Sequence, residues 1–158
     1  MSTLKGTKST GWRAGILALV MTAAVGLSAC SHVMAMMGHG AQRPAASDFG
    51  FGPRTSAAGR FTGTLEADAQ LRPRRLQTVR VILRDSNGQS VEDAALRIDG
   101  GMPQHGHGLP TRPRVSRTLG NGAYEIEGVR FNMGGWWEFK VVIESAAGAD
   151  TITFNLDI

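Results

Sequence analysis

The sequence has 158 residues, of which 17 are basic, 13 are acidic and one is a cysteine, with a formal net charge of +4. A single cysteine excludes an internal disulfide. Three basic residues and no acidic ones fall within the first 13 positions, which leaves 14 basic and 13 acidic residues, a net charge of +1. This balance lacks the basic excess typical of nucleic-acid-binding domains, so we expect no nucleic-acid partner.

The first 29 residues have the layout of a secretory signal peptide, in which basic positions precede the uncharged apolar stretch 14–29. That stretch is shorter than the about 20 residues that a membrane-spanning helix needs. It ends in Leu-Ser-Ala-Cys at 27–30, which resembles the lipobox of bacterial lipoproteins. The resemblance implies cleavage before Cys30, acylation of that cysteine, for example with palmitate, and anchoring of the chain to a membrane of the bacterial cell envelope. Ser31 next to the cysteine favours the outer membrane, facing the periplasm. An ordinary signal peptide and an uncleaved anchor helix are the alternatives.

Residues 30–59 are rich in small residues, Gly and Pro and show no apolar period, which predicts a flexible lipidated tether. The tether contains a local group of sulfur and imidazole side chains: Met34, Met36, Met37 and His39. This group is a candidate second, looser copper-binding cluster. The alternative is that it only continues the small apolar composition that follows the signal peptide.

From residue 60 the pattern changes to apolar–polar alternation with turn residues between the runs, which is typical of strands with one buried face. Seven short strands are predicted, at 60–66, 79–84, 94–99, 114–119, 124–126, 136–144 and 151–158. Asn121-Gly122 marks a hairpin turn between the fourth and fifth of them. The predicted fold is an all-β, immunoglobulin-like antiparallel β-sandwich over residues 60–158, with a small barrel as the alternative.

Two connections of this sandwich carry candidate metal ligands. The connection between the third and fourth strands contains Met102, His105 and His107, and the connection between the fifth and sixth contains Met133. Two imidazoles and two thioethers suit copper, because thioether selects Cu(I) and imidazole accepts either oxidation state. In an up-and-down strand count both connections lie at the same end, so we expect them to converge. The alternatives are a solvated glycine-rich loop and a Met133 that only fills the core.

The adjacent Trp136 and Trp137 support a hypothesis of a different class. One indole is expected to face the core and the other to be half exposed, which would offer an edge for docking a protein of the cell envelope. We expect no enzyme, because no carboxylate is placed to orient His105 or His107 and no phosphate-binding loop precedes a helix.

The motifs Met-Pro-x-His-x-His-Gly at 102–108 and Phe-x-Met-x-Gly-x-Trp at 131–137 resemble the YtkA-like family, which is related to the FixH-like proteins. The resemblance extends over roughly residues 75–145. It implies an immunoglobulin-like envelope domain, and FixH-like members are associated with copper supply to respiratory oxidases. This chain departs from them in having a lipobox where they retain a membrane helix. The prediction is therefore a membrane-anchored copper carrier or scavenger.

Overall fold

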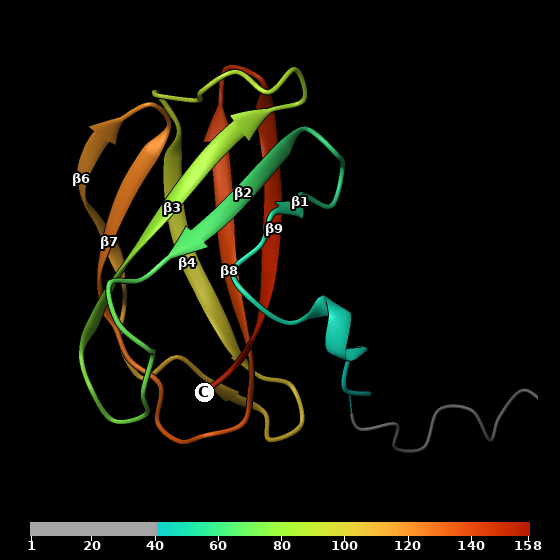
Figure 1. Cartoon of the computed structure of the whole chain (residues 1–158), viewed down its shortest axis with the longest axis vertical. Helices are drawn as coiled ribbons and strands as arrows, with labels where there is room; N and C mark the ends of the chain where they lie inside the picture. Colours follow the sequence, from blue (N-terminus) through green and yellow to red (C-terminus); the bar gives the residue numbers. More distant parts are fainter. Residues whose placement is uncertain (1–40) are drawn as a thin grey trace, which may run out of the picture. The chain divides into compact units, whose positions relative to one another are not determined.

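The computed structural model describes residues 41–158, which form two antiparallel sheets packed face to face (Figure 1). One sheet has the strand order β1-β2-β3-β7-β6 and the other has the order β5-β4-β8-β9. The strands span Arg54–Thr55 (β1), Phe61–Glu66 (β2), Gln77–Asp85 (β3), Ala95–Met102 (β4), His107–Gly108 (β5), Arg114–Gly120 (β6), Ala123–Val129 (β7), Trp136–Ser145 (β8) and Gly148–Asp157 (β9). The predicted sandwich is confirmed, and the barrel is wrong. The two additional strands, β1 and β5, have only two residues each.

Several predicted features lie outside the described residues. They are the signal peptide, the lipidation site Cys30, and the cluster Met34, Met36, Met37 and His39. Within residues 41–158 no helix is long and apolar enough to cross a membrane. The described helix is a single 3-10 turn, η2, over Ala46–Asp48.

The core lies between the two sheets and is built by alternation. In β2, β3 and β9 every second side chain of the buried run faces the core. In β8 the alternation runs from Trp137 to Ile143, and Trp136 before it is buried as well. Each large apolar side chain that is fully buried stabilises the fold by about 1.5–3 kcal/mol. The largest such side chains are Trp137, Tyr124, Phe61, Phe131, Phe139 and Phe154.

Two devices fix the end of the sandwich where β6 turns into β7. Asn121 and Gly122 have φ values of 53° and 71°, the left-handed pair that a two-residue hairpin turn requires, as predicted. The hydroxyl of Tyr124 donates to the carbonyl of Val91 at 2.8 Å and accepts from the amide of Ala94 at 3.0 Å. These bonds tie β7 to the connection between β3 and β4. Burial raises the pKa of Tyr124, so the phenol keeps the proton that it donates.

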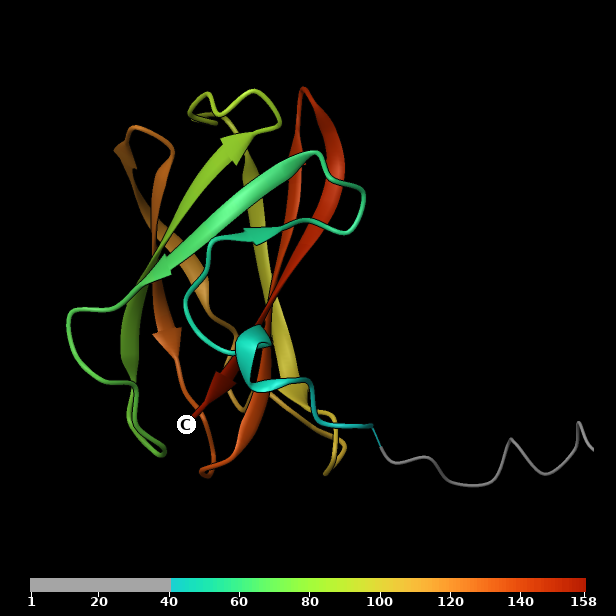
Figure 2. The same cartoon turned by 45° about the vertical axis from the view of Figure 1, so that its right-hand side comes forward.

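The predicted tether is corrected from residue 43 onward, because this segment packs against the sandwich (Figure 2). Phe49 forms a bridge with Asn155 of β9, while β1 pairs with β2 of the other sheet. Arg43 lies over the Phe49 ring and pairs with Asp157 at 2.9 Å. The segment therefore covers the free edges of both sheets on one side, and covered edges avoid the cost of unpaired backbone groups.

The turn between β1 and β2 is held by Asp150 of β9. Its carboxylate accepts hydrogen bonds from the Ser56 hydroxyl at 2.7 Å, the Ala58 amide at 3.1 Å and the Arg60 amide at 3.3 Å. Partial burial opposes ionisation of this carboxylate, but the hydrogen bonds outweigh it and lower the pKa of Asp150 to about 2. Ser56 in turn is the one polar side chain among the described residues that is buried.

All these pairings and the whole core lie within residues 41–158, and residues 38–158 form one compact unit. A fragment spanning residues 38–158 therefore contains every strand pairing and core contact of the described residues.

Candidate functional site

The two connections that carry the predicted ligands meet at one end of the sandwich. One runs from β4 through β5 to β6, and the other joins β7 to β8. A Cβ added at Gly135 of the second connection would lie 3.1 Å from Cε of Met102, at the start of the first. The expected placement of both connections at one end of the sandwich is confirmed. The two connections are separated along the chain by two long strands, β6 and β7. Because these strands run in opposite directions, the chain returns to the end from which it started.

Backbone hydrogen bonds place His105 and His107 close to Met102. The amides of His105 and Gly106 both donate to the Met102 carbonyl, at 3.0 and 2.9 Å. His107 is then directly opposite Met102 in the β4–β5 ladder. Side chains opposite each other in an antiparallel pair share a face, with Cβ atoms about 5 Å apart. The Met102 thioether and the His107 imidazole therefore leave the backbone side by side.

The imidazoles of His105 and His107 are both exposed and lie close together. Their ring centres are 6.1 Å apart, and the ring planes differ by 25°. Gly106 between them has a φ of +64°, a left-handed conformation that glycine adopts without strain. This glycine lets the tight turn present both rings to the same solvent region.

The two methionines have different surroundings. Met102 is 2% exposed and belongs to the core, whereas Met133 is 39% exposed. The alternative of Met133 as core filler is therefore wrong, and Met102 takes that position instead. The Met133 carbonyl accepts a hydrogen bond from Nε1 of the buried Trp137 at 3.0 Å, which fixes the connection at its middle.

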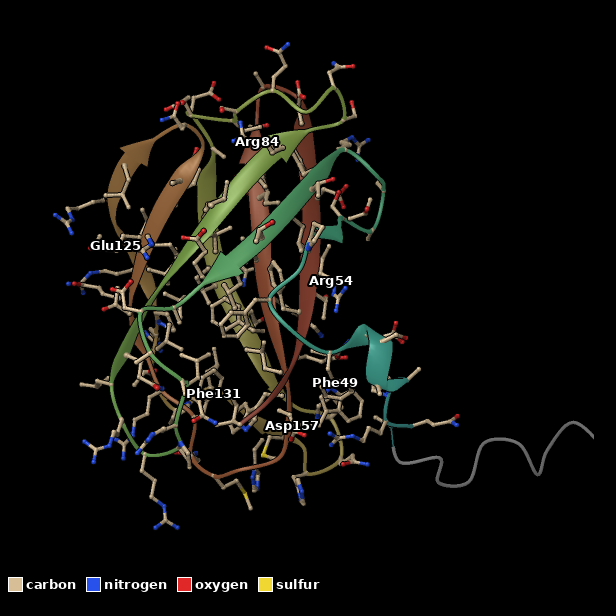
Figure 3. All side chains as sticks on the ribbon, in the orientation of Figure 1. Phe49, Arg54, Arg84, Glu125, Phe131 and Asp157 are labelled. Carbon is tan, nitrogen blue, oxygen red and sulfur yellow. The ribbon has the colours of Figure 1, made fainter. Side chains whose placement is uncertain are left out.

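Trp136 and Trp137 are both buried, at 4% and 0% exposure, so the expected half-exposed indole is corrected. Phe49 covers Trp136 with an edge-to-face contact of 6.5 Å between ring centres. Trp136 Nε1 also donates to Oδ1 of Asn155 at 2.9 Å. A partner could reach this edge only after displacement of the segment that contains Phe49. Figure 3 shows Phe49, Phe131 and Asp157 toward one end of the domain and Arg84 toward the other.

A hollow of about 270 Å³ borders His107 on the β4–β5 side. Asp99 and Glu138 line it together with His107, and Glu138 pairs with Lys140 at 2.7 Å. Sequence reasoning missed these carboxylates because they come from different strands, and only the β4–β8 register brings Gly101 opposite Glu138. Within residues 41–158, no three His, Cys, Asp or Glu side chains come close enough to hold one ion.

A family model described as YtkA-like matches residues 60–142. The chain belongs to the YtkA-like family. The matched range begins at the start of β2 and ends within β8, so it includes both connections of the candidate site. Searches of curated proteins and of solved structures found no significant match to this YtkA-like chain.

Proposed function

We propose that this YtkA-like chain is a lipid-anchored protein of the bacterial cell envelope that carries or scavenges copper through His105, His107, Met102 and Met133. The observation that supports it is the pairing of Met102 with His107, with the His105 ring centre 6.1 Å from that of His107. Two exposed imidazoles thus lie beside a soft thioether that packs on the core side of the same loop.

The distances fit a single ion held by both rings. Metal–nitrogen bonds are about 2 Å long and a ring nitrogen lies about 1 Å from its ring centre, so the two centres stay within about 6 Å. The separation of 6.1 Å is at that limit. The proposal requires the ring nitrogens of both histidines to turn toward one ion, which two exposed side chains on a loop that contains Gly106 permit.

The donor types favour copper over zinc. Zinc sites are built from His, Cys and carboxylates, and no triplet of these occurs among residues 41–158. Thioethers select Cu(I), and imidazoles bind either oxidation state. Met133, exposed on the facing connection, is a donor that a bound Cu(I) can recruit, whereas Met102 supports the site from the core side.

The anchor at Cys30 places this site in the cell envelope, on the outer membrane facing the periplasm. Its support is the lipobox-like sequence at 27–30. Mass spectrometry of the protein purified from bacterial membranes tests this part separately. A Cys30→Ser variant should lose the acyl mass, and an unmodified, soluble wild-type protein would contradict the anchor.

Copper binding is tested by titrating Cu(I), without oxygen and against a chromogenic chelator, into the 38–158 fragment. We expect about one equivalent to bind, as one His/Met site allows. A variant combining His105→Ala with His107→Ala should lose this binding, while the matched loop variant Gln104→Ala should retain it. Met133→Leu should weaken Cu(I) binding more than Cu(II) binding, because it removes only a thioether.

Two outcomes would contradict the proposal. One is no copper uptake by the wild-type fragment, and the other is equal uptake by the double histidine variant. Uptake by the full chain alone, lost on substitution of Met34, Met36, Met37 and His39, would move the site to the tether.

A further inference from the structure

The near-neutral charge of the domain hides a strong separation of charge. Residues 41–158 contain 14 basic and 13 acidic side chains. Six arginines gather at the end that carries the His/Met loops, on the connections β2–β3, β5–β6 and β7–β8 and on the first residue of β6. We call this group the basic pole: Arg72, Arg74, Arg75, Arg112, Arg114 and Arg130. All six are exposed, and Glu127 pairs with Arg114. The other carboxylates at this end, Asp99, Glu138 and Asp157, pair with basic side chains outside the group.

The connections of the basic pole are held in place by backbone and side-chain bonds. The Gln77 side chain accepts from the Arg72 amide at 2.7 Å and donates to the Arg72 carbonyl at 3.0 Å. The Arg74 amide donates to the Phe131 carbonyl at 2.7 Å, which joins the first connection to the β7–β8 connection. The Thr111 hydroxyl donates to the Gly128 carbonyl at 2.7 Å. These bonds bring arginines that are up to 58 positions apart in the sequence to one surface.

Apolar side chains are exposed within the same surface. Leu76, which directly follows Arg75, is 70% exposed. Met133, which lies on the same β7–β8 connection as Arg130, is 39% exposed. They are two of the four large apolar side chains that are exposed among the described residues. A hollow of about 360 Å³, lined by Leu76, Arg112 and Arg114 among others, lies between the arginines.

The opposite end of the sandwich is acidic. Its connections and strand ends carry Asp85, Glu92, Asp93, Glu144 and Asp150 against Arg60 and Arg84. A domain with opposite charges at its two ends orients in an electric field, and the basic end turns toward an anionic surface.

We propose that the basic pole docks the domain on a bilayer that contains anionic phospholipids. Arginines beside an exposed apolar side chain fit a bilayer interface, because the guanidinium groups meet phosphates while the leucine enters the acyl boundary. The described chain also begins at this end, since Arg43 contacts Asp157 at the end of β9. The first described residues are therefore on the docking side. This inference is independent of copper binding.

The test uses the 38–158 fragment, which lacks Cys30, so that only the domain can bind. Co-sedimentation is measured with vesicles of phosphatidylcholine alone or with about 30% phosphatidylglycerol. We expect binding to the anionic vesicles only, and its loss when salt is raised from about 0.05 to about 0.5 M. Leu76→Gln should weaken this binding without changing its dependence on salt.

A charge-matched pair of triple variants locates the surface. In the first, Arg72→Gln, Arg74→Asn and Arg75→Gln remove three pole charges, and Asn tolerates the φ of +64° at position 74. Affinity for anionic vesicles should fall on the order of 100-fold, because each arginine near such a surface contributes on the order of a fivefold factor. In the second, Arg54→Gln, Arg60→Gln and Arg84→Gln remove the same charge away from the pole and should leave binding nearly intact.

Equal losses in the two triple variants would overturn the proposal, because net charge rather than the pole would then govern binding. Failure of the folded wild-type fragment to bind anionic vesicles at low salt would also overturn it. Binding to an acidic peptide but not to these vesicles would assign the pole to a protein partner instead, and would equally refute the membrane. Circular dichroism confirms that each variant is folded.

Discussion

Asp150 offers the sharpest test of how the N-terminal segment is held to the sandwich. Its carboxylate accepts hydrogen bonds from Ser56, Ala58 and Arg60, which fix the turn between β1 and β2. We predict that Asp150→Asn destabilises the domain at pH 7 and that this destabilisation shrinks as the pH falls from 3.8 through about 2. The amide keeps the shape of the side chain but removes the charge that these donors stabilise.

The magnitude follows from the pKa of Asp150, which is lowered from 3.8 to about 2. At about 1.4 kcal/mol per pKa unit this difference corresponds to at most about 2.5 kcal/mol. Asp150 is partly exposed, so solvent screening reduces the expected contribution to about 1–2 kcal/mol. Because the pKa is lowered in the folded state, this stabilisation is complete above the unfolded pKa of 3.8. It is lost as the pH falls toward 2.

The assay is unfolding of the 38–158 fragment by heat and by urea at pH 7, 4 and 2.5. At pH 7 the variant should melt about 4–8 °C below the wild type, for a domain of this size. At pH 2.5 the difference should be about a third of that at pH 7, because the folded carboxylate is still partly ionised just above its pKa of about 2. Asp93→Asn is the control, because Asp93 is exposed and accepts no hydrogen bond among the described residues. A difference that stays the same at pH 7 and pH 2.5, or no loss at pH 7, would refute the reasoning.

Two further predictions concern side chains that join distant segments. Phe49→Ala should cost about 2 kcal/mol, because it removes an edge-to-face contact and half-buried area from Trp136. Tryptophan emission should also shift to the red as Trp136 meets water, whereas Phe51→Ala should leave that emission unchanged. Tyr124→Phe should cost about 1–2 kcal/mol in urea unfolding, because the Val91 carbonyl and the Ala94 amide lose their shared partner. An unchanged free energy of unfolding in either variant would contradict the contact that it tests.

The strands were predictable because burial of one sheet face imposes alternation on the sequence. Phe61, Val81, Phe139 and Phe154 occupy apolar positions of the predicted strands, and all four are fully buried. The meeting of the two His/Met connections was predictable for a similar reason, since counting strands is enough to place their connections at one end. Neither inference needs to know which strand pairs with which.

The surroundings of the individual site residues were not predictable in this way. In the sequence Met102 and Met133 are equivalent candidate ligands, each on a glycine-rich connection. In the structure only the Met102 side chain is buried, because it packs against Gly135 of the other connection. The segment around Phe49 has Gly and Pro and no alternation, so nothing local indicates that it covers Trp136 and pairs with Asn155. Its stability comes from sheet edges that are distant in sequence.

By itself the sequence determined the number of long strands, their buried faces and the end of the sandwich where His105, His107 and Met133 lie. Each of these follows from local periodicity and from the order of elements along the chain. The tertiary structure alone decided that Trp136 is covered, that Met102 faces His107, and that the six arginines of the basic pole share one surface. All three depend on which strands are neighbours in each sheet, for example β3 beside β7 and β4 beside β8. The apolar–polar periodicity of a strand shows which of its faces is buried, but not which strand it pairs with.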